Sequence, residues 1–368
     1  MNDRNVTLPS MAENLAHRGG HWRLILSVGL LVLAAALVWV SLGLHEPPRR
    51  AGPSDLDTYE RVVAALKAGQ GYYQALHQAL LDGGYGTLSP LNWRTPFFLV
   101  MVSWFPSLAA AQWALAGAAV AAWGLAVAFA YRRLGVMGAI WAGIVVALSL
   151  ISIGAPRAEL SFELFAGTLI LMSVCAHGLG WRWAAIAAGA LALFVRELAL
   201  VYVVVCLIDA MRRRDRGEAI AWLVCLMAYG AYYQFHMQQV AAQLGPLDHA
   251  AATGWLQLGG LDFVLRTAAF NGVLIALPFW VAALVLPVGL LGLTRLPRAG
   301  ATVLIYLLLF LIIGRPENDY WGAMFAPLVA LGVVFAPRAI ADLLFRARGS
   351  HPPALPVPPP DKREGVPD

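Results

Sequence analysis

Long apolar blocks separated by short polar turns fill most of this 368-residue sequence. The first block, Trp22 to Leu44, spans roughly 30 Å as a helix, which is the thickness of the hydrocarbon core of a bilayer. Only 13% of the residues are charged, about half the share in an average soluble domain, which excludes a water-soluble fold. We therefore expect an all-α polytopic membrane protein with about ten transmembrane helices. The nine further apolar blocks cover approximately residues 107–131, 135–153, 160–178, 183–196, 198–211, 219–237, 271–293, 300–314 and 320–337.

The basic residues between these blocks predict the orientation of the chain. If the N-terminus is cytoplasmic, every turn on the cytoplasmic side contains arginine, whereas the opposite turns are poor in lysine and arginine. Both termini are therefore expected on the cytoplasmic side of a bacterial inner membrane. The net charge of +5 then reflects orientation and does not indicate a nucleic-acid partner. The arginines concerned are Arg132, Arg133, Arg182, Arg212, Arg213, Arg214, Arg295, Arg298, Arg338, Arg346 and Arg348.

The polar segments divide the chain into three regions. Residues 1–21 form a cytoplasmic N-terminal segment, residues 22–337 a transmembrane domain, and residues 338–368 a proline-rich cytoplasmic tail. Within the domain, residues 45–95 and 238–270 form two loops on the outer face. The first loop has helical periodicity and predicts two short helices.

Helices in that loop are expected over Leu56 to Ala68 and Tyr72 to Leu81, each followed by glycine. Two later blocks, on either side of Arg196 and Glu197, have only about 14 residues each, which is short for a crossing. Residues 183–211 are therefore either two crossings or a re-entrant pair.

Ionisable residues gather at the outer boundary of the predicted bilayer. Such groups are expensive near membrane depth and commonly have a function. A structural role is an open alternative for each of them. Ser54 or Asp55 would cap the helix that follows, with Asp57 favourably placed at its positive end, and residues 315–320 would form a solvated turn. Arg196 and Glu197 would point about 100° apart on a helix and pair with other helices instead of with each other.

Several classes of chemistry lack their motifs in this sequence. There is no glycine-rich phosphate loop, no Gly-x-Ser-x-Gly and no His-Glu-x-x-His. The histidines are scattered without the spacing of metal ligands, so the sequence predicts neither a metal site nor a cofactor.

Short motifs give the chain a resemblance to a known family. Asp55-Leu56-Asp57-Thr58-Tyr59 follows the first helix directly, and Asn92-Trp93-Arg94-Thr95-Pro96 leads into the second. Two further similar motifs are Arg196-Glu197 and the stretch from Arg315 to Pro327. In these positions the chain resembles integral-membrane glycosyltransferases of the GT-C fold, which use polyprenyl-phosphate sugars and include arabinosyl-, mannosyl- and aminoarabinose-transferring enzymes.

The resemblance implies a sugar transfer from a polyprenyl-phosphate-linked donor to an acceptor on the outer face, among membrane lipids. The leaving phosphate needs no acid, but the acceptor hydroxyl needs a general base. Asp55 is the first candidate for this base and Asp57 the second. The acceptor is left open as a lipid, a glycan or a protein.

Guanidinium groups suit the departing phosphate because they carry positive charge in a planar fork of donors. Arg196 and Arg315 are the first candidates and Arg94 the third, with Glu197 beside them as a substrate-binding residue. Tyr59 and Tyr320 are expected to stack on sugar faces.

Two other functions remain open. A transporter or flippase of a lipid-linked or polar solute needs ionisable residues through the middle of the bilayer. The blocks at 107–131, 135–153, 271–293 and 300–314 have almost none, which favours an enzyme working at one face. A non-catalytic scaffold would tolerate neutral substitutions of the ionisable residues.

Overall fold

The computed structural model describes residues 11–45, 54–250 and 257–347. Within these ranges the secondary structure is helical and contains no strand, so the all-α class is confirmed. The α-helices are α1 (Met11–Gly43), α2 (Asp55–Lys67), α3 (Tyr72–Asp82), α4 (Pro96–Ser103), α5 (Leu108–Leu150), α6 (Phe162–Gly178), α7 (Arg182–Val195), α8 (Leu200–Arg212), α9 (Arg216–Ala241), α10 (Gly260–Ala269), α11 (Phe279–Leu293), α12 (Pro297–Ile312) and α13 (Ala326–Ala347). The 3₁₀ segments are η1 (Pro90–Asn92), η2 (Ile151–Gly154), η3 (Ala158–Leu160), η4 (Glu197–Ala199), η5 (Gly272–Ala276) and η6 (Pro316–Met324).

The structure has α2 and α3 where the sequence predicted two short helices. In two apolar blocks, the α-helix begins later in the chain than expected. The block expected from residue 271 begins as a 3₁₀ segment, and α11 starts only after Pro278, since proline suits a helix start better than a helix interior. The block expected from residue 320 begins as η6, and its α-helix starts only at Ala326. Four polar residues just before residue 320 interrupt the apolar pattern there.

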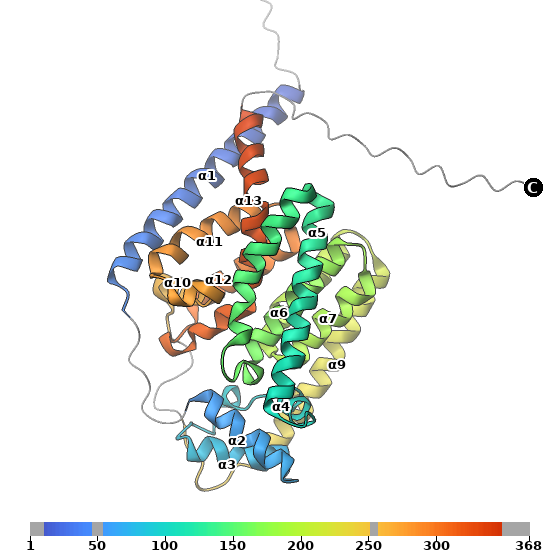
Figure 1. Cartoon of the computed structure of the whole chain (residues 1–368), viewed down its shortest axis with the longest axis vertical. Helices are drawn as coiled ribbons and strands as arrows, with labels where there is room; N and C mark the ends of the chain where they lie inside the picture. The colour runs from blue at the N-terminus through green and yellow to red at the C-terminus, as the bar shows by residue number, and fades with distance from the viewer. Residues whose placement is uncertain (1–10, 46–53, 251–256, 348–368) are drawn as a thin grey trace, which may run out of the picture.

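α5 consists of two helices that form a hairpin. Gly135 interrupts it with φ 75° and ψ −164°, a left-handed conformation that glycine tolerates. Beyond this point the chain reverses, and Trp123 Nε1 donates to the carbonyl oxygen of Gly143 at 2.8 Å. The predicted blocks at 107–131 and 135–153 are therefore two neighbouring helices, as Figure 1 shows.

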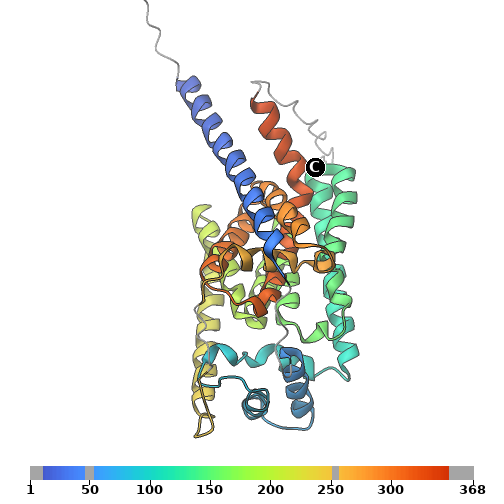
Figure 2. The ribbon, with the colours of Figure 1, turned by 90° about the vertical axis from the view of Figure 1, so that its left-hand side faces the viewer.

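The molecule has two chemically different ends, which we call the loop end and the basic end. Figures 1 and 2 show α2 and α3 together at the loop end, opposite the start of α1 and the end of α13. At the basic end, Arg132 Nη1 donates to the Leu179 carbonyl at 2.9 Å, and Arg338 Nη1 donates to the Arg133 carbonyl at 3.1 Å. Turns that the sequence assigned to one side of the membrane therefore contact one another.

Small residues allow the helices to pack closely. α11 lies against α13, and a Cβ atom at Gly292 would collide with the carbonyl oxygen of Gly332. Close approach of backbones at small residues is typical of helices that associate in lipid.

Large apolar side chains cover much of the surface. Trp113 and Met137 of α5 and Met227 of α9 are each more than half exposed, a pattern that a protein in water rarely tolerates. Within the described residues, Leu108–Gly154 and Ala326–Leu343 are long and apolar enough to cross a membrane, and five shorter apolar helices accompany them. The count of ten crossings stays a prediction.

The helix pair around Arg196 has its apex towards the loop end. Arg182, at the start of α7, pairs with Asp215 at 3.3 Å, and Arg213, just after α8, pairs with Glu218 at 2.6 Å. Both outer ends of the pair therefore lie at the basic end. Each helix is only about 20 Å long, so its apex carries Arg196 into the bundle below the layer of α2 and α3.

Candidate functional site

Asp55 is held by two tyrosines from distant parts of the chain. The Tyr85 hydroxyl donates to Oδ1 at 2.6 Å, and the Tyr320 hydroxyl donates to Oδ2 at 2.9 Å. Asp55 opens α2, Tyr85 follows α3, and Tyr320 belongs to η6. The carboxylate is therefore fixed by three segments, and each of its oxygens retains capacity for one more hydrogen bond.

Asp57, two residues later, has the capping role. It is the third residue of α2, and its carboxylate accepts hydrogen bonds from the backbone N–H and the hydroxyl of Ser54, each at 2.7 Å. Arg157 also pairs with it. The hydrogen bonds from Ser54, with help from Arg157, lower the pKa of Asp57 to about 2. Asp57 is thus a weak proton acceptor, and the capping alternative describes it better than it describes Asp55.

Arg94 lies buried just before α4. Its Nε donates to the Tyr59 hydroxyl at 2.9 Å, and its Nη1 is 3.5 Å from Oε1 of Glu197. The Tyr72 hydroxyl donates to the Arg94 carbonyl at 2.8 Å, which fixes the backbone. Tyr59 is itself buried and supports Arg94 with its hydroxyl, a different use from the sugar stacking expected of it.

Arg196 lies at the apex between α7 and α8, where the backbone leaves the helix with φ −145° and ψ 120°. This extended conformation lets Arg196 and Glu197 form an ion pair. The expectation that these neighbours point apart was wrong, because it assumed that both are helical. Arg196 Nε is also 2.7 Å from Oε1 of Glu163, in the first turn of α6.

These contacts join into one cluster at the loop end. α2 contributes Asp55 and, one turn later, Tyr59, which accepts from Arg94. Glu197 then bridges Arg94 and Arg196. We call Arg94, Arg196, Glu163 and Glu197 the arginine–glutamate cluster.

Arg315 was expected at the site from the sequence, whereas Glu163 was not. Arg315 is half-buried at the start of η6, the segment that brings Tyr320 to Asp55. Glu163 was missed from the sequence, because an acid in the first turn of a helix is an ordinary helix-terminal residue. Tyr85 belongs to the first loop, but nothing in the sequence linked its hydroxyl to Asp55.

A row of aromatic residues on α9 faces the cluster and the first loop. Tyr232 accepts a hydrogen bond from the backbone N–H of Phe97 at 2.9 Å, and His236 lies 3.2 Å from the Trp93 carbonyl. The first loop and the segment after α9 are also connected directly, since Nε2 of His77 is 2.7 Å from Oδ1 of Asp248. α9 and the second loop thus hold the first loop in place.

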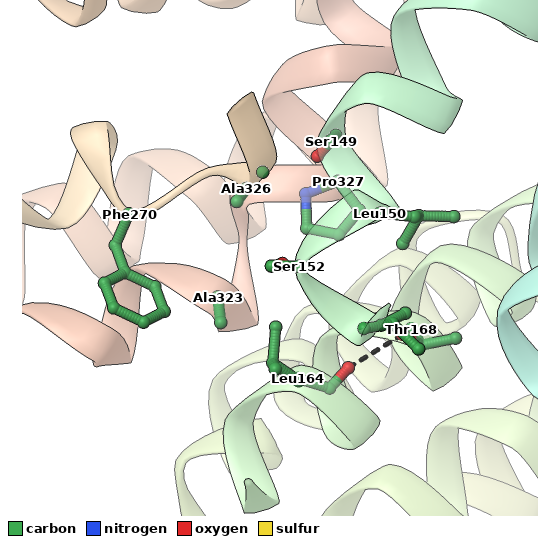
Figure 3. Close-up of a pocket in the computed structure, with 11 residues that line it drawn as sticks. Ser149, Leu150, Ser152, Leu164, Thr168, Phe270, Ala323, Ala326 and Pro327 are labelled. Atoms are coloured by element: carbon green, nitrogen blue, oxygen red, sulfur yellow. Dashed lines mark hydrogen bonds between the residues drawn. The ribbon is translucent and has the colours of Figure 1, made fainter. Parts of the chain in front are cut away.

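Two hollows lie near the cluster. Figure 3 shows a crevice beside η6 and α6, lined by Ser149, Thr168, Ala323 and Pro327, with a volume of about 10 Å³. That is room for about one water molecule and not for a sugar. A second, open hollow lies outside α2, is lined by Asp57, Glu60, Arg61 and Ala64, and has a volume of about 570 Å³. Asp55 and the buried arginines line neither of them.

Comparisons with known proteins identify the fold. No protein-family model matches the chain, and no curated protein matches its sequence. The crystal structure of ArnT from Cupriavidus metallidurans bound to undecaprenyl phosphate is similar, with a TM-score of 0.51 and 13% identity over 88% of this chain and 62% of that chain. Its apo state gives a TM-score of 0.50 and 16% identity, over 88% and 61%. The chain thus spans about three fifths of the length of ArnT. The similarity to these two structures supports the GT-C fold that was expected from the sequence.

Proposed function

We propose that this protein is an integral-membrane glycosyltransferase that moves a sugar, a hexose or a pentose, from a polyprenyl-phosphate donor to an acceptor on the outer face of a bacterial inner membrane. The observation that carries the proposal is the fixed Asp55 carboxylate at the same end as the buried arginines. The fold it shares with an ArnT structure that holds undecaprenyl phosphate supports a lipid-phosphate donor.

Asp55 acts as the general base in this proposal. It takes the proton of the acceptor hydroxyl as that oxygen attacks the anomeric carbon. The bond from the anomeric carbon to the phosphate oxygen breaks, and polyprenyl phosphate leaves with the electron pair. Burial first, and the Asp55 carboxylate second, hold the pKa of the Tyr320 hydroxyl well above its ordinary value. The phenol therefore stays protonated and keeps donating to Asp55 while the base works.

The arginines receive the charge that develops on the departing phosphate. Arg94 and Arg196 suit this role because both guanidinium groups are buried, and the carboxylate that they share is the more exposed partner. Arg315 is the third candidate, since it stands at the start of the segment that contributes Tyr320. Asp57 organises α2 in this scheme and does not take part in proton transfer.

The loop end faces outward in this proposal. The arginine-rich turns meet at the other end of the molecule, where both termini belong by the positive-inside rule. A donor anchored in the outer leaflet then presents its head group to Asp55.

The decisive experiment measures sugar transfer by purified protein in liposomes that contain polyprenyl-phosphate mannose, arabinose or aminoarabinose. Replacing the base, Asp55→Asn, is expected to slow turnover by about 10² to 10⁴-fold, the usual contribution of one general base. Binding of undecaprenyl phosphate and the melting temperature should stay near those of the wild type. Asp82→Asn, an exposed acid of the same loop, is the matched control and should transfer normally.

Full transfer by Asp55→Asn would remove the base assignment. Movement of the lipid-linked sugar across the liposome membrane, without transfer to any acceptor, would instead support the alternative of a transporter or flippase.

A further inference from the structure

Glu197 occupies an unusual position in the arginine–glutamate cluster. Its carboxylate is shared by Arg94 and Arg196, yet its side chain is 28% exposed, whereas the two arginine side chains are 7% and 1% exposed. The open side of this ion-pair group is therefore the carboxylate. A ligand that arrives at the group meets Glu197 first.

Both arginines keep their orientation without Glu197. Arg94 still donates to Tyr59 at 2.9 Å, and Arg196 still lies 2.7 Å from Glu163. These partners come from α2 and α6, so other elements than the one that carries Glu197 also hold the two guanidinium groups. The place between the arginines can thus change its occupant while the arginines stay where they are.

A tyrosine on α9 packs against the end of α7, next to the apex that carries Glu197. Among the described residues, the Tyr229 hydroxyl is buried and makes no hydrogen bond, which is costly for a polar group. The centroid of the Tyr229 ring lies 5.5 Å from that of Phe194, which precedes Glu197 by three residues in the chain. In the exchange proposed below, Glu197 turns away from the arginines and gives the Tyr229 hydroxyl an acceptor.

We propose that Glu197 is an internal substitute for the donor phosphate: it fills the anion position between Arg94 and Arg196, yields it to the phosphate and turns towards Tyr229. This inference rests on the proposed function and adds a phosphate position and an exchange to it. A carboxylate and a phosphate oxygen make the same kind of hydrogen bond to guanidinium, so either satisfies the arginines.

The exchange also has a consequence for product release. The donor phosphodiester carries one negative charge, whereas the released polyprenyl phosphate carries about 1.5 to 2 at neutral pH, by analogy with other phosphate monoesters. Two buried arginines therefore hold the product more strongly than the donor. The return of Glu197 competes with the product and speeds its departure, a step that limits turnover in many enzymes.

The experiment compares the binding of undecaprenyl phosphate to purified full-length variants in detergent with the rate of sugar transfer in liposomes. Glu197→Gln is expected to bind undecaprenyl phosphate about tenfold more tightly, because a neutral amide competes with the phosphate for the two guanidinium groups more weakly than a carboxylate does. Its turnover should fall, with a burst of the first product before slow release. Glu60→Gln, an exposed acid of α2 that lies 3.9 Å from Arg157, is the control and should match the wild type in both measurements.

A second variant tests the alternative position of the carboxylate. Tyr229→Phe removes the hydroxyl that receives Glu197 and should weaken the binding of undecaprenyl phosphate about threefold, since one modest hydrogen bond is lost from the bound state. This variant keeps the ring and its packing, so it remains informative if Glu197→Gln proves unstable.

The outcomes separate this inference from the proposed function. Binding by the wild type with equal or weaker binding by Glu197→Gln overturns the exchange and leaves the glycosyltransferase proposal standing. If neither the wild type nor any variant binds undecaprenyl phosphate, both proposals fail. Unchanged binding in Tyr229→Phe removes the second position of Glu197.

Discussion

Both ends of the molecule bury arginine against carboxylate, but the two clusters differ in accessibility. At the basic end, Arg298 lies 2.6 Å from Asp209 and 2.5 Å from Glu218. Glu218 is buried and also accepts from Arg213 at 2.6 Å and from Trp222 Nε1 at 3.1 Å. At the loop end, the shared carboxylate is the exposed member, and the guanidinium groups are buried.

This difference separates a structural cluster from an exchangeable one. The carboxylate of Glu218 has three donors around it, and they connect the turn between α8 and α9 to the start of α12. No small anion can replace it without breaking contacts between helices. Among the described residues, the Glu197 side chain pairs with the two arginines, and each arginine has another partner, so we propose that a ligand can take the place of Glu197.

The largest expected effect concerns the basic end. Glu218→Ala leaves Arg298 buried without one of its carboxylates, and breaking a buried ion pair in this way costs about 3–5 kcal/mol. Thermal unfolding in detergent should show the loss, while sugar transfer per folded molecule should stay at the wild-type rate. A strong loss of transfer by molecules that remain folded would mean that the basic end takes part in the reaction. The distinction between a structural cluster at the basic end and an exchangeable cluster at the loop end would then be wrong.

A smaller effect is expected from the tyrosines that hold Asp55. Tyr320→Phe and Tyr85→Phe each remove one hydrogen bond to the carboxylate, worth about 1.5–3 kcal/mol when the acceptor is charged. Turnover should fall about tenfold in each variant, with the KM for the donor unchanged. Tyr131→Phe, an exposed tyrosine near the basic end, is the matched control. Normal turnover in both test variants would mean that Asp55 does not need to be held.

The smallest effect concerns Asp57 and acid pH. Because its pKa is lowered to about 2 from an ordinary 3.8, ionised Asp57 stabilises the fold above about pH 4, and this contribution disappears as the pH falls through 2. The melting temperature of the wild type should therefore drop more between pH 4 and pH 2 than that of Asp57→Asn, which lacks the contribution at every pH. Equal pH dependence of the two proteins would show that the cap contributes little.

Much of the fold could be predicted from the sequence because it depends on local patterns. Apolar length and turn residues predicted α6, α7, α8 and α9 to within a few residues. Errors occurred where local patterns are ambiguous. Apolar residues before Pro278 form a 3₁₀ segment, and α1 begins at Met11, before its expected start at Trp22, since most polar residues there also permit a helix.

For the candidate site, the sequence predicted several of the residues but not the partners with which they pair. Asp55, Arg94, Arg196 and Glu197 do belong to one end of the molecule, as their places between apolar blocks indicated. Their partners could not be predicted. Glu163 was hidden as a helix-terminal acid, and the pairing of Arg196 with Glu197 depends on an extended residue that periodicity does not reveal.

The sequence by itself determined which segments are apolar helices and which side of the bundle each turn joins, because length, hydropathy and charge act within a few residues of chain. Only the tertiary structure decided that Tyr85 and Tyr320 hold one carboxylate and that Glu197 lies between two arginines. Those contacts connect residues that are 30 and 265 positions apart, or depend on how α4 meets α7. Directional hydrogen bonds over such separations are set by helix packing, which no local pattern encodes.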